Sequence, residues 1–364
     1  MENVLSHNSG GRSFMRNCHD WQRRSERCIK NSQNSFQYRQ MMVEELRKFI
    51  DFDAYCCSVT DTQTLFSIGA VTEQSIEDVH QKIMTFEYAF EDVNNYRKLV
   101  ESGQCIGRLS DASSQSLRYR EILVPNGFSD EILAALMFQG QCYGFLTLFK
   151  KMKNAQSIFQ DDELEQIKIL MPVMGEALKA FYHSIIEERL STEAGESGIV
   201  ILDKDYHILS MSTKASQILA LLRSNEGLSD GQLPKPIQAS CAKLQAEDNT
   251  PISLLVPIHD KGYITIQASF LMTTDLQQQI AILLNEASPK EMLAFLLTAY
   301  QLTPREKEVV VEMMRGIPTK VIAYNLGISS YTVQDHLKLI FQKVGVGDRN
   351  ELVWKIFSRF QINE

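Results

Sequence analysis

The chain has 364 residues, of which 44% are hydrophobic and 23% charged, a composition typical of a folded protein of two or three domains. No run reaches the roughly 18 consecutive apolar residues that a membrane-spanning helix needs, and residues 1–40 lack the apolar core of a secretory signal. The seven cysteines show no CxxC pair and no metal-ligand spacing, so we expect reduced thiols, no bound metal and a cytoplasmic location.

Charge is unevenly distributed along the chain. The net charge of −8 by itself argues against a nucleic-acid partner. However, residues 301–364 carry nine Lys or Arg against seven Asp or Glu, and residues 1–40 carry seven against three, so the excess acid lies in residues 41–300. This pattern permits a DNA-binding domain at the carboxyl end without demanding one.

The first 40 residues are rich in Asn, Ser, Gln and Arg and poor in aliphatic side chains. Because such a segment has little apolar surface to bury, we expect residues 1–40 to form a disordered polar arm. Apolar residues at helical spacing in 40–50 then mark the start of the first folded domain.

Strand-like and helical patterns alternate after this point. Strands are predicted over 54–60, 65–68 and 141–149, and a helix over 79–100. A long helix is predicted over 162–189, where apolar residues recur at three- and four-residue steps. Its apolar seam fits either a coiled-coil-like dimer contact or packing onto its own sheet. The order of elements, with residues 159–164 opening the long helix, resembles a GAF sensor domain over 41–188.

A second β-rich region follows a short polar linker. Residues 198–203 and 208–211 predict a hairpin that precedes a helix, and further strands are predicted over 252–258, 263–271 and 279–284. This opening resembles a PAS domain over residues 195–288. The two resemblances imply antiparallel-sheet sensor domains with a small-molecule or protein effector as partner. The residues identify no cofactor.

From Leu302 onward the helix signals are the densest in the chain. Thr303 can cap a first helix, Pro304 suits its first position, and Glu306 can reach back to close a capping box. Gly316 is placed to end this helix.

A second helix is predicted over 318–326, and Gly327 provides the turn before a third helix over 329–344. A capping box at 348–351 opens a fourth helix. Helix, glycine turn and helix form the unit that fits the major groove of DNA. We therefore expect a multidomain α+β chain that ends in an all-α, four-helix, helix-turn-helix domain over 298–364.

The third predicted helix has one apolar face and one polar face. An isolated helix with two such faces usually has its polar face in water and contacts no DNA. The prediction of DNA contact therefore depends on the whole helix-turn-helix segment. Tyr331, Gln334, Asp335 and Lys338 share the polar face, and we expect them to contact base edges, since Gln suits adenine, Lys suits guanine and Asp accepts from cytosine. The residues expected to contact phosphate are Thr319, Lys320, Ser329, Ser330, Thr332 and Arg349.

The carboxyl-terminal segment resembles a LuxR-type helix-turn-helix. The resemblance is carried by residues 302–306, 316–323, 326–329, 332–338, 343–346 and 349–353. It implies that Gln334, Asp335 and Lys338 lie at the base-reading positions. It also implies that the fourth helix joins two copies of the chain, and the residues expected at this dimer contact are Leu352, Val353 and Ile356.

Three residues depart from the usual pattern of that family. Gln334 stands where many members have Lys, Val321 where Glu is usual, and Leu339 where Asn is common. These differences alter the expected operator sequence, while the caps and packing residues that build the domain are present.

Two function hypotheses follow. The first is a bacterial-type transcription regulator that binds double-stranded DNA as a homodimer, with its amino-terminal domains sensing an effector. The second is an anti-activator whose helix-turn-helix contacts a protein instead of DNA. The acidic middle and Asp335 favour the second, whereas the caps and Lys338 favour the first, which we expect. No GxxxxGK, HExxH or GxSxG motif occurs, so we expect no catalytic residues and no enzyme.

Overall fold

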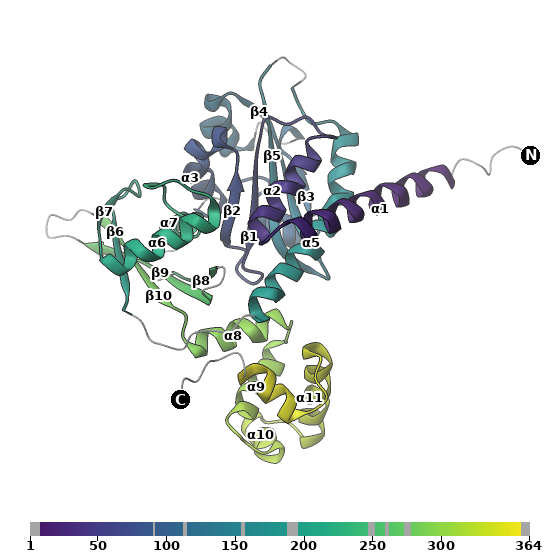
Figure 1. Ribbon diagram of the computed structural model, residues 1–364, viewed down its shortest axis with the longest axis vertical. Coiled ribbons are helices and arrows are strands. Elements are labelled where there is room, and N and C mark those ends of the chain that lie inside the picture. Colours follow the sequence, from purple (N-terminus) through teal and green to yellow (C-terminus); the bar gives the residue numbers. More distant parts are fainter. Residues whose placement is uncertain are drawn as a thin grey trace, which may run out of the picture. The chain divides into compact units, whose positions relative to one another are not determined.

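The computed structural model describes residues 8–89, 92–111, 115–153, 157–187, 196–246, 252–258, 262–272 and 278–357 (Figure 1). These residues form two compact units. The first unit contains two β-sheets with their helices, and the second consists mainly of the helices after residue 286. No helix in the described part of the chain is both long and apolar enough to cross a membrane.

The first sheet has five strands in the order β2-β1-β5-β4-β3, all paired antiparallel. The strands are β1 (Ala54–Thr60), β2 (Ser67–Thr72), β3 (Ile106–Arg108), β4 (Phe128–Phe138) and β5 (Gln141–Lys151). Its helices are α1 (Asn8–Asn31), α2 (Ser35–Leu46), α3 (Gln74–Ala89), α4 (Tyr96–Ser102) and α5 (Asp161–Glu187). The expected single helix over 79–100 is thus two helices, because the Asn95 side chain caps α4 by accepting from the Lys98 N–H.

The apolar seam of α5 packs onto its own sheet. A Cβ atom added at Gly175 would lie 2.7 Å from the carbonyl oxygen of Met137 in β4, so this approach of helix to strand needs a glycine. Ile167, Met174 and Leu178 of the seam are buried. The seam residues of α5 are thus used for packing onto its own sheet, one of the two arrangements that their spacing allows.

Helix α1 corrects the expectation of a disordered arm, because residues 8–31 are helical. Trp21 is only 3% exposed, and its ring contacts that of Phe49 edge-on with centroids 5.2 Å apart. Arg24 and Arg27 of α1 both pair with the Glu45 carboxylate of α2. One large aromatic residue and a shared carboxylate thus dock a helix whose composition is mostly polar.

The second sheet has the strand order β7-β6-β10-β9-β8, in which β6 pairs antiparallel with both neighbours. Its strands are β6 (Gly198–Leu202), β7 (Ile208–Met211), β8 (Ile252–Ile258), β9 (Gly262–Met272) and β10 (Gln278–Glu286), and its helices are α6 (Thr213–Glu226) and α7 (Lys235–Ala246). The predicted strands are found close to their expected positions. The two antiparallel sheets confirm the expected α+β fold class.

Polar contacts connect the two sheet regions inside the first unit. The fully buried ammonium group of Lys235 in α7 pairs with Glu77 of α3. Farther along the same two helices, His80 Nδ1 lies 3.2 Å from the side-chain oxygen of Gln238. Helices α3 and α7 are therefore joined by buried polar groups as well as by packing.

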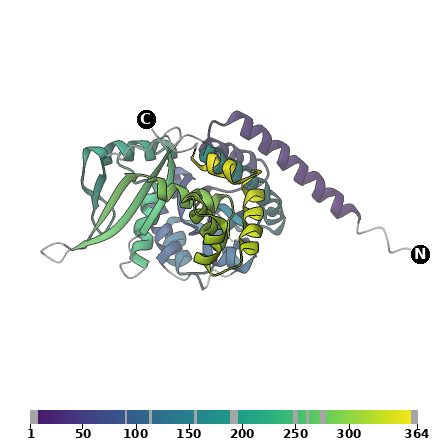
Figure 2. The ribbon, with the colours of Figure 1, turned by 90° about the horizontal axis from the view of Figure 1, so that it is seen from below.

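The second unit contains α8 (Pro289–Ala299), α9 (Pro304–Met314), α10 (Thr319–Leu326), α11 (Ser330–Val344) and α12 (Arg349–Phe357). These are the green-to-yellow helices of Figure 2. Their core is formed by residues from all five helices, among them Leu297, Val309, Val310, Met313, Ile322, Val333, Ile340, Val344, Leu352 and Ile356. The predicted all-α domain is confirmed, with α9 to α12 as its four expected helices.

Candidate nucleic-acid interface

Local hydrogen bonds define where α9 begins. The Thr303 hydroxyl accepts from the Glu306 N–H at 3.3 Å, and the Glu306 carboxylate accepts from the Thr303 N–H at 2.7 Å. Both halves of the predicted capping box are therefore formed.

The turn between α10 and α11 is also built as expected. Gly327 has φ 65° and ψ 36°, a left-handed conformation that glycine adopts without strain. Ser329 then caps α11 by accepting from the Thr332 N–H at 3.0 Å. Together these two residues fix the direction in which α11 leaves the turn.

An ion pair holds the far end of α11 against the start of α9. The ammonium group of Lys343 lies 2.6 Å from the Glu306 carboxylate and donates to the Gln301 carbonyl oxygen at 3.1 Å. Burial alone would raise the pKa of Glu306, but the hydrogen bonds from Lys343 and Thr303 outweigh it and lower that pKa. The carboxylate thus remains charged inside the fold and anchors both helices.

Helix α11 has the division of faces that its sequence predicts. Val333, Ile340 and Val344 are buried in the core. Tyr331, Gln334, Asp335 and Lys338 are exposed, and Tyr331 is 81% exposed. Since these four side chains lie within one arc of the helix, the structure brings all the predicted base-contacting residues onto one open face.

The basic residues of this unit divide into two groups. Six of the eight in residues 301–357, all of them described, bond to acidic, hydroxyl or carbonyl oxygens of the domain itself: Arg305, Lys307, Arg315, Lys343, Arg349 and Lys355. Lys320 and Lys338 are exposed and form no hydrogen bond or ion pair with the described residues. These two uncommitted cations lie on α10 and α11, the two helices of the helix-turn-helix.

The residues expected to contact phosphate fall into different environments. Lys320 and Ser329 are exposed, whereas Thr319, Ser330 and Thr332 are half-buried near the helix starts. The hydroxyls of Ser329 and Thr332 lie 2.9 Å apart and hydrogen-bond to each other.

Arg349, one of the residues expected to contact phosphate, forms hydrogen bonds within the domain. Its Nη2 donates to the carbonyl oxygens of Met313 and Ile317, both at 3.0 Å. Met313 lies in the last turn of α9, and Ile317 lies in the segment between α9 and α10. The guanidinium therefore links the start of α12 to the last turn of α9 and to the segment that follows it, a use that the spacing of residues in the sequence does not reveal.

The expected dimer contact is wrong for two of its three residues. Leu352 and Ile356 of α12 are 0% and 1% exposed and belong to the core of their own domain, and Val353 packs against that core. Among the exposed residues of α12 is one large apolar residue, Trp354, which is 72% exposed. Helical spacing identified the apolar face of α12 but could not tell whether the same chain or a second copy covers it.

Comparison with known families identifies the second unit. Residues 300–356 match the family model GerE, described as bacterial regulatory proteins of the luxR family. These residues form a LuxR-family domain. The chain is also similar to the transcriptional regulatory protein YdfI of Bacillus subtilis (strain 168), with 40% identity over 53 residues. That similarity covers 15% of this chain, which spans only a quarter (25%) of the length of YdfI.

Solved structures of two regulators show low overall similarity. The VqmA dimer of Vibrio cholerae, described among LuxR-type receptors, is 18% identical over 45% of this chain and 83% of its own, with a TM-score of 0.21. Escherichia coli SdiA is 14% identical over 95% of this chain and 99% of its own, with a TM-score of 0.34. TM-scores this low support no inference about ligands or partners.

Proposed function

We propose that the protein is a sequence-specific transcription regulator that places α11 in the major groove of double-stranded DNA. The observation that carries the proposal is the open face of α11, which presents Gln334, Asp335 and Lys338 on a domain of the LuxR family. The similarity of this domain to YdfI, a transcriptional regulatory protein, supports the same function.

The exposed side chains suit different parts of the DNA. Lys338 can donate to guanine O6 and N7, Gln334 can bond both hydrogen-bonding groups of adenine, and Asp335 can accept from cytosine N4. Lys320 and Ser329 suit phosphate, because a cation and a hydroxyl near helix starts can bind the DNA backbone. Asp335 also repels phosphates, so it lowers general affinity and makes binding more dependent on sequence.

The regulator acts as a homodimer in this proposal, with two copies of α11 in successive major grooves about 10 bp apart. Trp354 is the candidate for the contact between copies, in place of Leu352 and Ile356. Exposed tryptophan is rare on surfaces that stay in water, and it is enriched where protein interfaces are strongest.

The first unit senses an effector and controls DNA binding. Support comes from the order of elements in its two sheet regions, which resembles GAF and PAS sensor domains over about 41–188 and 195–288. Buried polar contacts between α3 and α7 give this unit a route by which an effector at one sheet region affects the other.

The proposal is tested by selecting bound duplexes from a random DNA library with the full-length protein. The affinity of a selected duplex is then measured over a salt series for wild type, Lys338→Ala and Lys290→Ala. Lys290 is an exposed cation of α8, so its loss changes net charge equally without touching α11. We expect an enriched sequence that Lys338→Ala binds at least fivefold more weakly and that Lys290→Ala binds as wild type does.

Absence of any enriched sequence from the folded protein would refute the proposal and favour the anti-activator hypothesis. Equal losses in both variants would show that only net charge matters, which would refute sequence reading by α11.

A further inference from the structure

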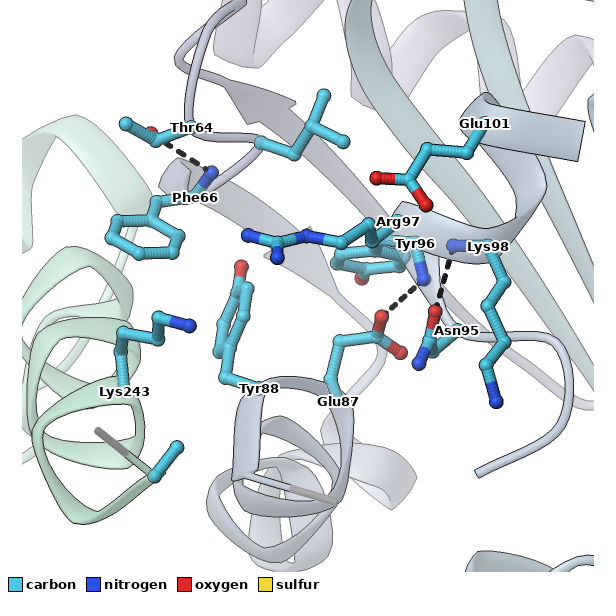
Figure 3. Close-up of a pocket in the computed structure, with 12 residues that line it drawn as sticks. Thr64, Phe66, Glu87, Tyr88, Asn95, Tyr96, Arg97, Lys98, Glu101 and Lys243 are labelled. Carbon is cyan, nitrogen blue, oxygen red and sulfur yellow. Dashed lines mark hydrogen bonds between the residues drawn. The ribbon is translucent and has the colours of Figure 1, made fainter. Parts of the chain in front are cut away.

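A pocket of about 270 Å³ lies inside the first unit, and Figure 3 shows its lining. One side comes from the segment between β1 and β2 and from α3 and α4, and the other comes from Lys243 and Ala246 at the end of α7. Its volume is near the lower limit for small-molecule sites, so it suits a ligand of one ring with a short substituent. Both sheet regions of the unit would contact such a ligand.

Aromatic side chains form a continuous part of the lining. The rings of Phe66 and Tyr88 meet edge to face with centroids 5.4 Å apart, and Tyr88 meets Tyr96 in the same way at 6.2 Å. The Tyr88 hydroxyl accepts from the Ser67 N–H at 2.9 Å, which fixes the ring. A planar aromatic ligand can therefore pack on a preformed surface at low entropic cost.

The pocket is lined by more positively charged side chains than by carboxylates that are free to repel an anion. Arg97, Lys98 and Lys243 line it together with the carboxylates of Glu87 and Glu101. The Glu87 carboxylate is buried and already accepts from Arg118 and from the Tyr96 N–H. Burial raises the pKa of Glu87 to about 7, although its bonds to Arg118 and Tyr96 oppose the rise. The pocket therefore favours an anionic ligand.

Arg97 is the group best placed to bind that anion. In Figure 3 its guanidinium extends across the pocket toward Phe66 and Tyr88. It is exposed and forms no hydrogen bond or ion pair with the described residues. The Lys243 ammonium lies 5.8 Å from the centroid of the Phe66 ring, so a second cation borders the same aromatic surface. A planar guanidinium matches a carboxylate with two parallel hydrogen bonds.

We infer that this pocket binds a small aromatic carboxylate, with its ring against Phe66 and Tyr88 and its carboxylate on Arg97. The inference builds on the proposed sensing function and specifies where the effector binds and of what class it is. A ligand seated there contacts α4 and α7 together, and so strengthens the junction that Lys235–Glu77 and Gln238–His80 already hold. Binding therefore stabilises the contact between the two sheet regions.

The test is calorimetric titration of the full-length protein, without DNA, using three probes. Benzoate has the ring and the charge, benzyl alcohol has the ring alone, and acetate has the charge alone. We expect saturable binding of benzoate that is at least tenfold tighter than binding of either other probe. Arg97→Ala should weaken benzoate binding at least tenfold, and Arg97→Lys should weaken it less.

Lys82→Ala is the matched control, because Lys82 is an exposed cation of α3 outside the pocket. It should bind benzoate as wild type does. No benzoate binding at millimolar concentration, equal binding of acetate, or an unchanged affinity in folded Arg97→Ala would overturn the inference. Because no DNA is present, benzoate binding by a protein that fails to select DNA would refute the proposed function and leave the pocket assignment intact.

Discussion

Lys343 reaches back across the helix-turn-helix to Glu306, its ammonium nitrogen 2.6 Å from the carboxylate oxygen. The same carboxylate closes the capping box of α9 by accepting from the Thr303 N–H. One buried acidic group thus caps the start of α9 and holds the end of α11 against it. The orientation of the proposed DNA-reading helix depends on the charge of Glu306.

The lowered pKa of Glu306 predicts how the stability of the second unit changes with pH. Because the pKa is lower in the folded state, the stabilisation is fully present above the unfolded pKa and is lost as pH falls through the folded pKa. Glu306→Gln should therefore lower the free energy of unfolding by about 1–2 kcal/mol at pH 7 and by less in acid. Denaturant unfolding of both proteins from pH 7 to pH 3 measures this difference.

A control for this prediction is Glu308→Gln. Glu308 lies in the same helix but is exposed, and among the described residues it pairs only with the neighbouring Arg305. Its replacement should change stability by less than about 0.5 kcal/mol. A Glu306→Gln deficit that stays constant down to pH 3 would contradict the assigned role of the charge.

Lys320 should contribute to DNA affinity without contributing to sequence choice. As an exposed, uncommitted cation of α10, it is proposed to contact phosphate. Lys320→Ala should weaken binding to selected and unselected duplexes equally and reduce the slope of log affinity against log salt by about 1. Lys338→Ala should instead cost roughly 1–3 kcal/mol on the selected duplex and relax preference at one base pair. Identical behaviour of the two variants would rule out this division of roles.

The caps of the carboxyl-terminal domain were predictable because each depends on residues three positions apart. Thr303 and Glu306 form their box within one helical turn, and Ser329 caps α11 in the same local way. The exposed face of α11 was likewise predictable from helical spacing. Together these local features account for the agreement between the expected and observed helix-turn-helix.

Features that depend on distant partners were not predictable. Strand β4 escaped recognition because Asp130 and Glu131 interrupt its apolar pattern, yet both are buried. Asp130 accepts from the Phe159 N–H at 2.8 Å, and Glu131 pairs with Arg118 at 3.1 Å, contacts that no local pattern reveals. The docking of α1 through Trp21 onto Phe49 was missed for the same reason.

Substitution of Arg349 distinguishes a structural role of this residue from a role in DNA binding. Its loss removes a charged donor from the carbonyl oxygens of Met313 and Ile317, although the Met313 oxygen still accepts from the Gly316 N–H. Arg349→Met should lower the free energy of unfolding by about 1–3 kcal/mol, because the hydrogen bonds come from a charged donor. At temperatures where the variant stays folded, the salt slope of DNA binding should remain that of wild type. A slope reduced by about 1 with unchanged stability would instead support the expected phosphate contact of Arg349.

Trp354 and Leu352 should behave oppositely on substitution, although they lie two residues apart in α12. Leu352 is fully buried in the domain core, so Leu352→Ala should cost about 2–5 kcal/mol of stability. Trp354 is 72% exposed, so Trp354→Ala should leave stability nearly unchanged. If α12 joins two copies through this side chain, the same variant should raise the dimer dissociation constant at least tenfold in sedimentation experiments. An unchanged dissociation constant would show that any dimer forms through another surface, and half-site spacing would then be set elsewhere in the chain.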